Sequence, residues 1–444
     1  MSAHGLETAG GGNGRQVGYV IKPGYKQVTV GVIPTDWEYV SFEQLYSEPS
    51  RNGIYKTSEF HGRGTRIVNM GEMFGYEFIG PQEMSHVALS RQELSVSGLQ
   101  QGDLLFGRRS VVPAGAGKCS MVIHLDEPLT FESSIIRVRL NTAVSDPRYY
   151  YYFFASTYGR STVETIVSGT NVKGIRASEL RELVVPQPTL VEQEAIAGAL
   201  GDADALVESL ERLLAKKRNL KQAAMQQLLT GKKRLPGFDG EWEEFNVSDV
   251  LQRSFSGPSP TCEERNIRGS EWGVLKTTAI TWQNGWDWTK HKTLPKAFWN
   301  QPESEVRCGD VLVTKAGPRH RVGVTACVDF VPERILPSGK MIALRPITSK
   351  VIGRMLAAAI ASPASQEYLD QRTTGMAEAQ VNFENDNLLD TPIKLPTMAE
   401  QTAIVEVLTD MDAEIYAIEA KINKARQIKA GMMQELLTGK TRLV

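Results

Sequence analysis

The sequence predicts an α+β protein in which two similar domains of mixed helix and strand are separated by two long helices packed as an antiparallel coiled coil. Three observations lead to this prediction. A stretch of 48 residues recurs without a gap, each copy has the heptad spacing of a long helix, and the segments between the copies mix short strand-like runs with turns. At 444 residues, the chain is long enough for two or three domains.

The repeated stretch runs from Pro188 to Leu235 and again from Pro396 to Leu443, and about half of its positions are identical. The copies lie 208 positions apart. This period is much longer than that of solenoid repeats, so it indicates a duplicated half-molecule with approximate two-fold symmetry. A two-fold protein favours two-fold partners.

Each copy is predicted to be one helix. A Pro-Thr pair stands where the helix begins, and Gly231 and Gly439 stand where a C-cap glycine belongs. Apolar residues in between alternate in steps of four and three, which is typical of a coiled-coil seam. These residues are Leu210, Leu213 or Leu214, Leu220, Ala224 and Leu228 in the first copy, and Met411, Ile415, Ile418, Ile422, Ala425, Met432 and Leu436 in the second. About 40 helical residues would span about 60 Å, and two such helices can bury their seams against each other.

The remaining chain divides around these helical spacers. Residues 30–187 and 236–395 are the predicted mixed domains, residues 188–235 and 396–444 are the spacers, and the Gly-rich residues 1–29 are a predicted flexible tail. In the domains, β-branched runs predict strands at Arg66 to Met70, Ser134 to Leu140 and Val311 to Thr314.

A weaker repeat joins the two domains. Gly102-Asp103-Leu104-Leu105 matches Gly309-Asp310-Val311-Leu312 at an offset of 207. Each domain also ends in a predicted helix, Arg148 to Thr165 in the first and Val351 to Arg372 in the second. Between such anchors the sequences diverge, so the domains are predicted to share a fold and to carry different surfaces.

Composition excludes several classes of protein. A net charge of −1 argues against a chain that is basic throughout. The four cysteines form no CxxC pair, which favours structural thiols in a reduced, cytoplasmic protein over a zinc site or a disulfide framework. No signal peptide is evident, and the most apolar run, Met355 to Ala361, is too short to span a bilayer.

No catalytic or metal-binding constellation is found in the sequence. The run GAGKC at Gly115 to Cys119 lacks the first glycine and the Ser or Thr of a phosphate-binding loop. Glu419-Ala420-Lys421 lies in the helical repeat, where a solvated helix face explains it. The six histidines are scattered, without HExxH. The sequence therefore favours a protein that binds and positions other molecules, with no metal or cofactor of its own.

Basic residues follow the Gly-Asp-x-Leu strand in both domains. Arg108-Arg109 precedes a turn that ends at Lys118, and the second domain has Lys315, Arg319 and Arg321 at the equivalent place. Such loops suit phosphate contacts and guanine edges, although each alone could be a solvated basic loop. The predicted DNA-binding residues are Arg108, Arg109, Lys118, Lys173, Lys292, Lys315, Arg319, Arg321 and Arg372, with Gln380 and Asn382 beside the last.

One further tract mixes aromatic and polar residues, from Trp282 to Lys292. Base stacking is conceivable there, but packing in a core or hairpin is the commoner use of tryptophan. The run from Tyr149 to Phe154 is predicted to be a core-facing helix.

Taken together, the PT(L/M)xEQxAI opening, the helix closing in LLTGK, its duplication, and the Gly-Asp-x-Leu strand resemble the specificity (S) subunit of type I restriction–modification enzymes. The resemblance covers the chain apart from its N-terminal tail. It implies two target-recognition domains that each read one half of a split DNA sequence. It also implies that the helical spacers set the half-site distance and dock two methyltransferase (M) subunits, to which nuclease/translocase (R) subunits are added.

In that family the chemistry belongs to the partners, so the resemblance implies S-adenosylmethionine, ATP and Mg on other subunits and no catalysis here. The residues predicted to bind partners are Glu192, Gln193, Ile196, Leu200, Glu400, Gln401, Ile404 and Leu408. Two alternatives remain: a coiled-coil adaptor that bridges two protein partners without touching DNA, and a nuclease or methyltransferase acting alone.

Overall fold

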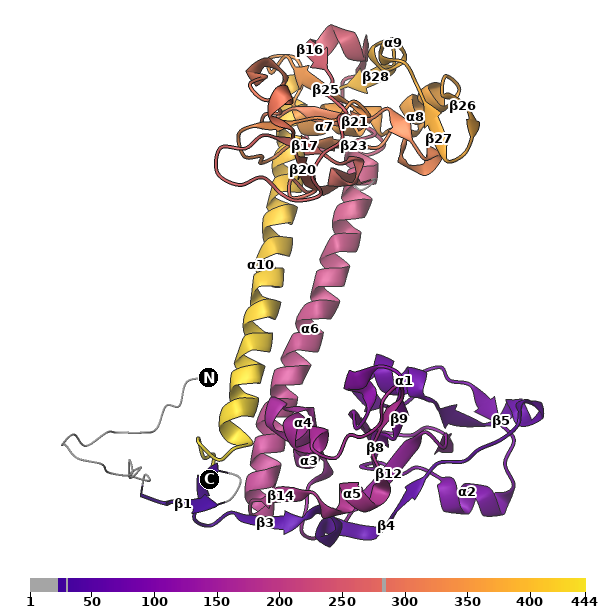
Figure 1. The fold of residues 1–444 in the computed structure, drawn as a ribbon. Helices are drawn as coiled ribbons and strands as arrows, with labels where there is room; N and C mark the ends of the chain where they lie inside the picture. The colour runs from indigo at the N-terminus through magenta and orange to yellow at the C-terminus, as the bar shows by residue number, and fades with distance from the viewer. Residues whose placement is uncertain (1–22, 29–30, 282–284) are drawn as a thin grey trace, which may run out of the picture. The chain divides into compact units, whose positions relative to one another are not determined.

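The structure, a computed structural model, describes residues 23–28, 31–281 and 285–444. The chain divides into two compact units (Figure 1): the first holds the residues up to Glu211 together with Ala420–Val444, and the second holds Arg212–Glu419. Each unit therefore contains one mixed domain, the first half of one long helix and the second half of the other.

The two repeats form the long helices α6 (Leu190–Leu228) and α10 (Met398–Leu436), each of 39 residues. The hydroxyl of Thr189 accepts a hydrogen bond from the backbone N of Glu192, and Thr397 caps α10 in the same way. Both helices stop before a glycine in the left-handed region, Gly231 with φ +67° and Gly439 with φ +69°. The predicted starts and C-cap glycines are confirmed.

Within each unit the two half-helices run antiparallel, side by side (Figure 1), and two-fold-related ion pairs link them. These pairs are Asp204–Lys429 and Glu211–Arg426 in the first unit, and Asp412–Lys221 and Glu419–Arg218 in the second. Every member of a pair has its counterpart 208 positions along the chain. The predicted antiparallel packing is thus confirmed inside both units.

The seam of α6 takes Leu214 of the two alternatives predicted there, and it differs from the prediction at Leu220. Leu214 is half-buried, whereas Leu213 and Leu220 are 41% and 47% exposed. Near Leu220 the facing positions are taken by Lys217 and Lys221, whose ammonium groups reach Glu414 and Asp412 on α10. Lysine stems can cover apolar surface while their charges stay in water, so the helix does not need Leu220 in the seam.

In the first unit the main sheet has five strands, in the order β4-β12-β8-β10-β6. These strands are Tyr46–Asn52, Ile135–Leu140, Leu104–Gly107, Cys119–Val122 and Phe78–Ile79. A three-stranded sheet, β11-β5-β7, comprises Leu129–Phe131, His61–Val68 and His86–Val87. Two-stranded pairs complete the unit: β1-β2 (Tyr25–Val28, Gly31–Pro34), β14-β3 (Val184–Gln187, Glu38–Ser41) and β13-β9 (Lys173–Gly174, Arg109–Ser110).

The second unit repeats this plan. Its main sheet, β16-β25-β21-β23, comprises Leu251–Phe255, Met341–Pro346, Val311–Thr314 and Thr325–Cys327. The sheet β20-β17-β24 comprises His291–Thr293, Gly273–Leu275 and Ile335–Leu336. Smaller sheets are β15-β28 (Glu243–Asn246, Pro392–Leu395), β18-β19 (Ile280–Thr281, Gly285–Trp286) and β22-β27-β26 (Ala316–Gly317, Gln380–Asn382, Thr374–Ala377).

Three short helices occupy equivalent places in the two domains. They are α3 (Pro147–Ala155), α4 (Thr157–Glu164) and α5 (Ala177–Glu182) in the first, and α7 (Gly353–Ile360), α8 (Pro363–Asp370) and α9 (Asn385–Leu389) in the second. The first domain also contains α1 (Met70–Gly75) and α2 (Arg91–Ser97). The predicted single helices are therefore two helices each. Ser156 and Ser362 break them, because each serine adopts an extended backbone and caps the helix that follows.

The Gly-Asp-x-Leu motif is a structural element. Asp103 is fully buried, accepts a hydrogen bond from the backbone N of Gln100, and binds Arg139 on β12 through both carboxylate oxygens at 2.7 Å. Asp310 repeats the arrangement with Arg345 on β25, at 2.8 Å. The hydrogen bonds that Arg139 and Arg345 donate to these carboxylates raise the pKa of each arginine. The motif thus fixes the turn into an inner strand of both sheets.

Candidate nucleic-acid interface

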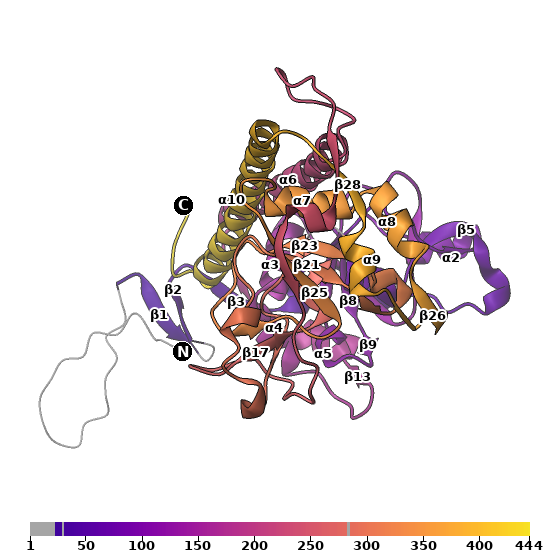
Figure 2. The same ribbon diagram turned by 90° about the horizontal axis from the view of Figure 1, so that it is seen from above.

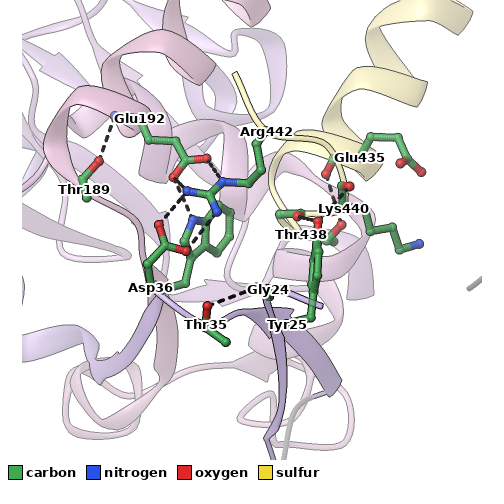
Figure 3. Close-up of polar contacts among 12 residues, drawn as sticks. Gly24, Tyr25, Thr35, Asp36, Thr189, Glu192, Glu435, Thr438, Lys440 and Arg442 are labelled. Atoms are coloured by element: carbon green, nitrogen blue, oxygen red, sulfur yellow. Dashed lines mark hydrogen bonds and ion pairs between the residues drawn. The ribbon is translucent and has the colours of Figure 1, made fainter. Parts of the chain in front are cut away.

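The residues shared by the two helical repeats hold each helix to its own domain. Glu192 is fully buried, and its carboxylate accepts hydrogen bonds from Trp37 Nε1 and Arg442 Nη2, both at 2.8 Å. Arg442 also binds Asp36 through two nitrogens, at 2.9 and 2.7 Å (Figure 3). These contacts raise the pKa of Arg442, and the guanidinium lowers the pKa of Asp36. The end of α10 is thereby fastened to the start of α6.

The second unit contains the same clasp. Glu400 is 1% exposed and binds Arg234 through both oxygens at 2.5 Å. Gly231 packs against the ring of Trp242 as Gly439 packs against Trp37. The Trp242 indole nitrogen has no hydrogen-bond partner among the described residues, which is the main departure from the first clasp.

Gln193 and Gln401 form a second shared contact. The side-chain oxygen of Gln193 accepts from the backbone N of Asp146 at 2.9 Å, and its amide donates to the carbonyls of Pro188 and Val144. Gln401 does the same with Ile352, Pro396 and Lys350. Each glutamine thus ties its long helix to the loop that starts α3 or α7.

These contacts overturn the predicted partner-binding role of the repeat motif. All eight residues are at most 3% exposed, with the isoleucines and leucines inside the hydrophobic cores of their own domains. They leave no surface for another subunit. The residues are Glu192, Gln193, Ile196, Leu200, Glu400, Gln401, Ile404 and Leu408. Packing within the chain explains why both copies keep them.

The basic residues of the first domain divide into two groups. Arg108 donates to the carbonyl of Ser133, and Lys118 donates to the carbonyl of Phe74 at 3.0 Å. Burial lowers the pKa of Lys118. Both side chains therefore support the loop. Arg109 is exposed and has no side-chain partner among the described residues, so it is available to a ligand.

In the second domain most predicted basic residues are engaged. Arg319 pairs with Asp370 and Glu378, and Lys292 pairs with Glu264. Arg321 donates to the carbonyls of Thr277 and Ile280. Lys315 donates to Asn385, while Arg372 lies 3.5 Å from the centre of the Tyr368 ring. Cations held in this way support the loops. Those that donate to neutral groups add positive potential to the surface, whereas the charges of Lys292 and Arg319 are offset by the carboxylates they pair with.

The structure brings two separately predicted segments together. Strand β9, with Arg109, pairs with β13, where Gly174 lies opposite Arg109 and Lys173 opposite Ser110 (Figure 2). In the second domain β22 pairs with β27 in the same way, with Ala316 opposite Asn382. Lys173, opposite Ser110, therefore stands where Val381 stands opposite Gly317 in the second domain.

The sequence prediction missed the exposed turn beside Lys173. Residues 168–172 are all exposed, and they include Thr170, Asn171 and Val172. A bridge between Ser168 and Gly174 makes this segment a hairpin. The Ser-Gly-Thr-Asn run before Val-Lys-Gly was a turn signal that could have identified it.

The tryptophan tract lies partly outside the described residues, since Trp282, Gln283 and Asn284 are not described. Trp286 donates to the carbonyl of Phe330 at 2.7 Å, and Trp288 stacks on His291. Packing within the domain accounts for these two rings. Of the predicted tail, residues 1–22 and 29 are likewise not described, and Tyr25–Val28 form β1.

Over the described ranges, no group of three or more His, Cys, Asp or Glu side chains could hold a metal ion. No helix among these residues is long and apolar enough to cross a membrane. The two domains share one scaffold with equivalent interiors. Their exposed loops carry different polar residues. Such a protein presents two different binding surfaces.

Comparison with known proteins identifies the family. The model of the type I restriction modification DNA specificity domain matches residues 34–216 and 240–427. The chain belongs to this family.

Two curated relatives illustrate the range of similarity. The chain is 30% identical over 196 residues to the type I restriction enzyme EcoEI specificity subunit of Escherichia coli, covering 44% of this chain and 33% of that protein. It is 22% identical over 432 residues to the putative type I restriction enzyme MjaX specificity subunit of Methanocaldococcus jannaschii, covering 94% and 97%. The match thus spans about a third of the first relative and nearly all of the second.

Solved structures show the same fold. The S subunit of a type I restriction–modification system from M. genitalium has a TM-score of 0.51 at 14% identity, covering 90% of this chain and 96% of that one. A chain from a study of complex assembly and conformational transition of the type I R-M system has a TM-score of 0.56 at 17% identity, covering 92% and 99%.

Proposed function

We propose that this chain is the DNA-specificity subunit of a type I restriction–modification complex. Each domain reads one half of a split, asymmetric DNA sequence, and the paired helices set the distance between the halves. One observation carries the proposal: the interiors of the two domains repeat contact by contact, whereas the exposed residues after the Gly-Asp-x-Leu strand differ. Two similar readers with different surfaces suit two different half-sites.

Catalysis is assigned to partner subunits. The chain itself performs neither methylation nor cleavage, and S-adenosylmethionine, ATP and Mg are used by the methyltransferase and nuclease/translocase subunits. Family membership supports this assignment.

The proposal is tested by selection from a pool of randomised DNA duplexes. The full chain, assembled with the methyltransferase subunits encoded beside it, is expected to enrich two short sequences separated by a fixed gap. Sequencing of modified adenines in cells that express the complex should give the same motif. Retention of the methyltransferase subunits without enrichment of any sequence would favour the adaptor alternative. Turnover of DNA by the isolated chain would favour the solitary enzyme.

Docking of the methyltransferases needs a surface other than the buried repeat motif. Within the two long helices, three polar positions are identical in the two repeats, exposed, and without a side-chain partner among the described residues: Asp202/Asp410, Lys216/Lys424 and Gln226/Gln434. Packing does not require identity at exposed positions. We therefore assign these pairs to equivalent docking sites for two copies of one partner.

Charge reversal tests this docking surface. Lys216→Glu and Lys424→Glu are each expected to remove one of two bound methyltransferase copies, and the double variant both, as counted by native mass spectrometry. Lys233→Glu is the matched control, because Lys233 is exposed and its counterpart in the other repeat is Thr441. Two copies retained by the double variant would exclude this surface.

A further inference from the structure

Two exposed hairpins stand at equivalent places in the two domains. Hairpin 1 comprises residues 168–174, follows α4 and pairs with β9; hairpin 2 comprises residues 374–382, follows α8 and pairs with β22. Each contains a glycine with positive φ, Gly169 at +104° in the turn of hairpin 1 and Gly375 at +142° on strand β26 of hairpin 2. A Cβ at Gly169 or Gly375 would come within 2.3 or 2.7 Å, respectively, of a carbonyl on the opposite arm, so both positions require glycine.

Hairpin 1 offers a cationic and apolar surface. It contains no carboxylate, and Lys173 on its second arm donates only to the carbonyl of Gly169. Arg109 lies on the neighbouring strand and is unpaired among the described residues. Val111 and Val172, next to the paired residues, are 77% and 49% exposed. Exposed valines beside a free arginine have no role in the domain's own core.

Hairpin 2 offers a neutral polar surface instead. Gln380 and Asn382 are exposed, while Val381 between them is 2% exposed and anchors the strand in the core. The Asn382 carboxamide oxygen accepts a hydrogen bond from Thr374 at 3.0 Å, which leaves its amino group to donate elsewhere. The nearby carboxylate of Glu378 faces Arg319 at 3.4 Å, so the acid on this hairpin is matched by a cation.

We propose that these two hairpins are the base-reading elements, each entering the major groove of one half-site. This inference rests on the proposed function and adds the chemistry that each half-site requires. A two-stranded β-ribbon fits the major groove, where arginine pairs with guanine, glutamine and asparagine pair with adenine, and apolar side chains contact the thymine methyl group. Hairpin 1 together with its partner strand β9 therefore reads guanine through Arg109 of β9, with thymine beside Val111 or Val172. Hairpin 2 reads adenine through Gln380.

The contacts of the neighbouring basic residues explain why base recognition is assigned to Arg109 and Gln380. Arg108, Lys118 and Arg321 donate to backbone carbonyls of their own domains, so they stabilise the loops beside the hairpins. Arg109 and Gln380 are exposed, and no side-chain partner competes for them among the described residues. Groups free of internal partners can form a bidentate contact with a base without losing a contact in the protein.

Two substitutions test the assignment by exchanging the base-contacting side chains of the two domains. Arg109→Gln should change one base of the first half-site from guanine to adenine, and Gln380→Arg should change one base of the second from adenine to guanine. Each change should shift relative affinity for the two bases by about tenfold to a hundredfold. The readout is the motif enriched from randomised duplexes by the full chain in its methyltransferase complex.

Matched controls carry the same chemical change at exposed sites away from the hairpins. They are Arg91→Gln at the start of α2 and Gln252→Arg on β16. Both should leave the motif unchanged. A half-site altered only in the domain that carries the hairpin substitution supports the proposal. An unaltered motif in both hairpin variants overturns it, while failure of the unmodified chain to enrich any split motif overturns the proposed function itself.

Discussion

Arg442 and Glu192 lie 250 residues apart in the sequence and form a bidentate ion pair, with Nη2 2.8 Å from Oε2. Arg234 and Glu400 repeat it in the other unit. Each pair joins the end of one long helix to the beginning of the other. Because Glu192 is fully buried, its charge has to be compensated locally.

Removal of the arginine should therefore be costly. Arg442→Met leaves a buried carboxylate with only Trp37 as donor, and we expect a loss of about 3 kcal/mol in the stability of the first unit. This loss is measured as faster hydrogen exchange of the backbone amides in the first turns of α6. Arg426→Met is the control: its ion pair with Glu211 is exposed on both sides, so it should cost at most about 1 kcal/mol. Equal losses would contradict the importance of the clasp.

Acid should weaken the same clasp through Asp36. Hydrogen bonding to Arg442 lowers the pKa of Asp36 in the folded state. The group therefore contributes stability above the ordinary pKa of aspartate, and this contribution is lost as the pH falls through the lowered value. Asp36→Asn should lower the melting temperature of the first unit at neutral pH, and the difference should vanish in strong acid. Asp410→Asn, at an exposed aspartate, should show no such pH dependence.

The sequence was most informative where local rules decide the structure. Helix ends at Thr189 and Gly231 follow from capping chemistry, and the two-fold arrangement follows from the repeat itself. The break at Ser156 was missed because no proline marks it between Arg148 and Thr165. Its extended backbone and the capping hydrogen bond that its hydroxyl oxygen accepts from the backbone N of Gly159 distinguish this serine from one inside a helix.

The candidate site was harder to predict, for two reasons. Identity between the repeats was attributed to partner binding, yet Gln193 is identical to Gln401 because both satisfy the same backbone groups. The other reason is direction. Arg108 and Arg109 are neighbours in the sequence, but one side chain turns to Ser133 and the other to solvent. No spacing rule separates them without the strand pairing of β9 with β13.

The glutamine contact can be tested separately from the charges. Gln193→Glu keeps the shape of the side chain but cannot donate to the carbonyls of Pro188 and Val144, and it places a charge in a buried site. We expect a loss of about 3 kcal/mol or more. Gln226→Glu, at an exposed position of the same helix, should change stability by less than about 0.5 kcal/mol. Urea unfolding of the full chain followed by circular dichroism compares the two.

Salt dependence of DNA binding should separate the free arginine from the engaged ones. Arg109→Ala is expected to reduce the slope of log affinity against log salt by about one, with the melting temperature unchanged because the side chain is exposed. Arg321→Ala should instead lower the melting temperature, since it removes donors to Thr277 and Ile280. The reverse pattern would assign the DNA contact to Arg321 instead of Arg109.

The length of the paired helices should set the gap between half-sites. Insertion of four residues after Leu214 and four after Ile422 adds about 6 Å and a rotation of about 40° to each helix. One base pair adds about 3.4 Å along the duplex, so we expect the preferred gap to grow by one or two base pairs with both half-sites unchanged. Selection from randomised duplexes measures the gap. A four-residue insertion after Gly269, in an exposed turn, is the control and should leave it unaltered. If the gap stays the same in the double insertion, the helices do not set the spacing, and another part of the complex must do so.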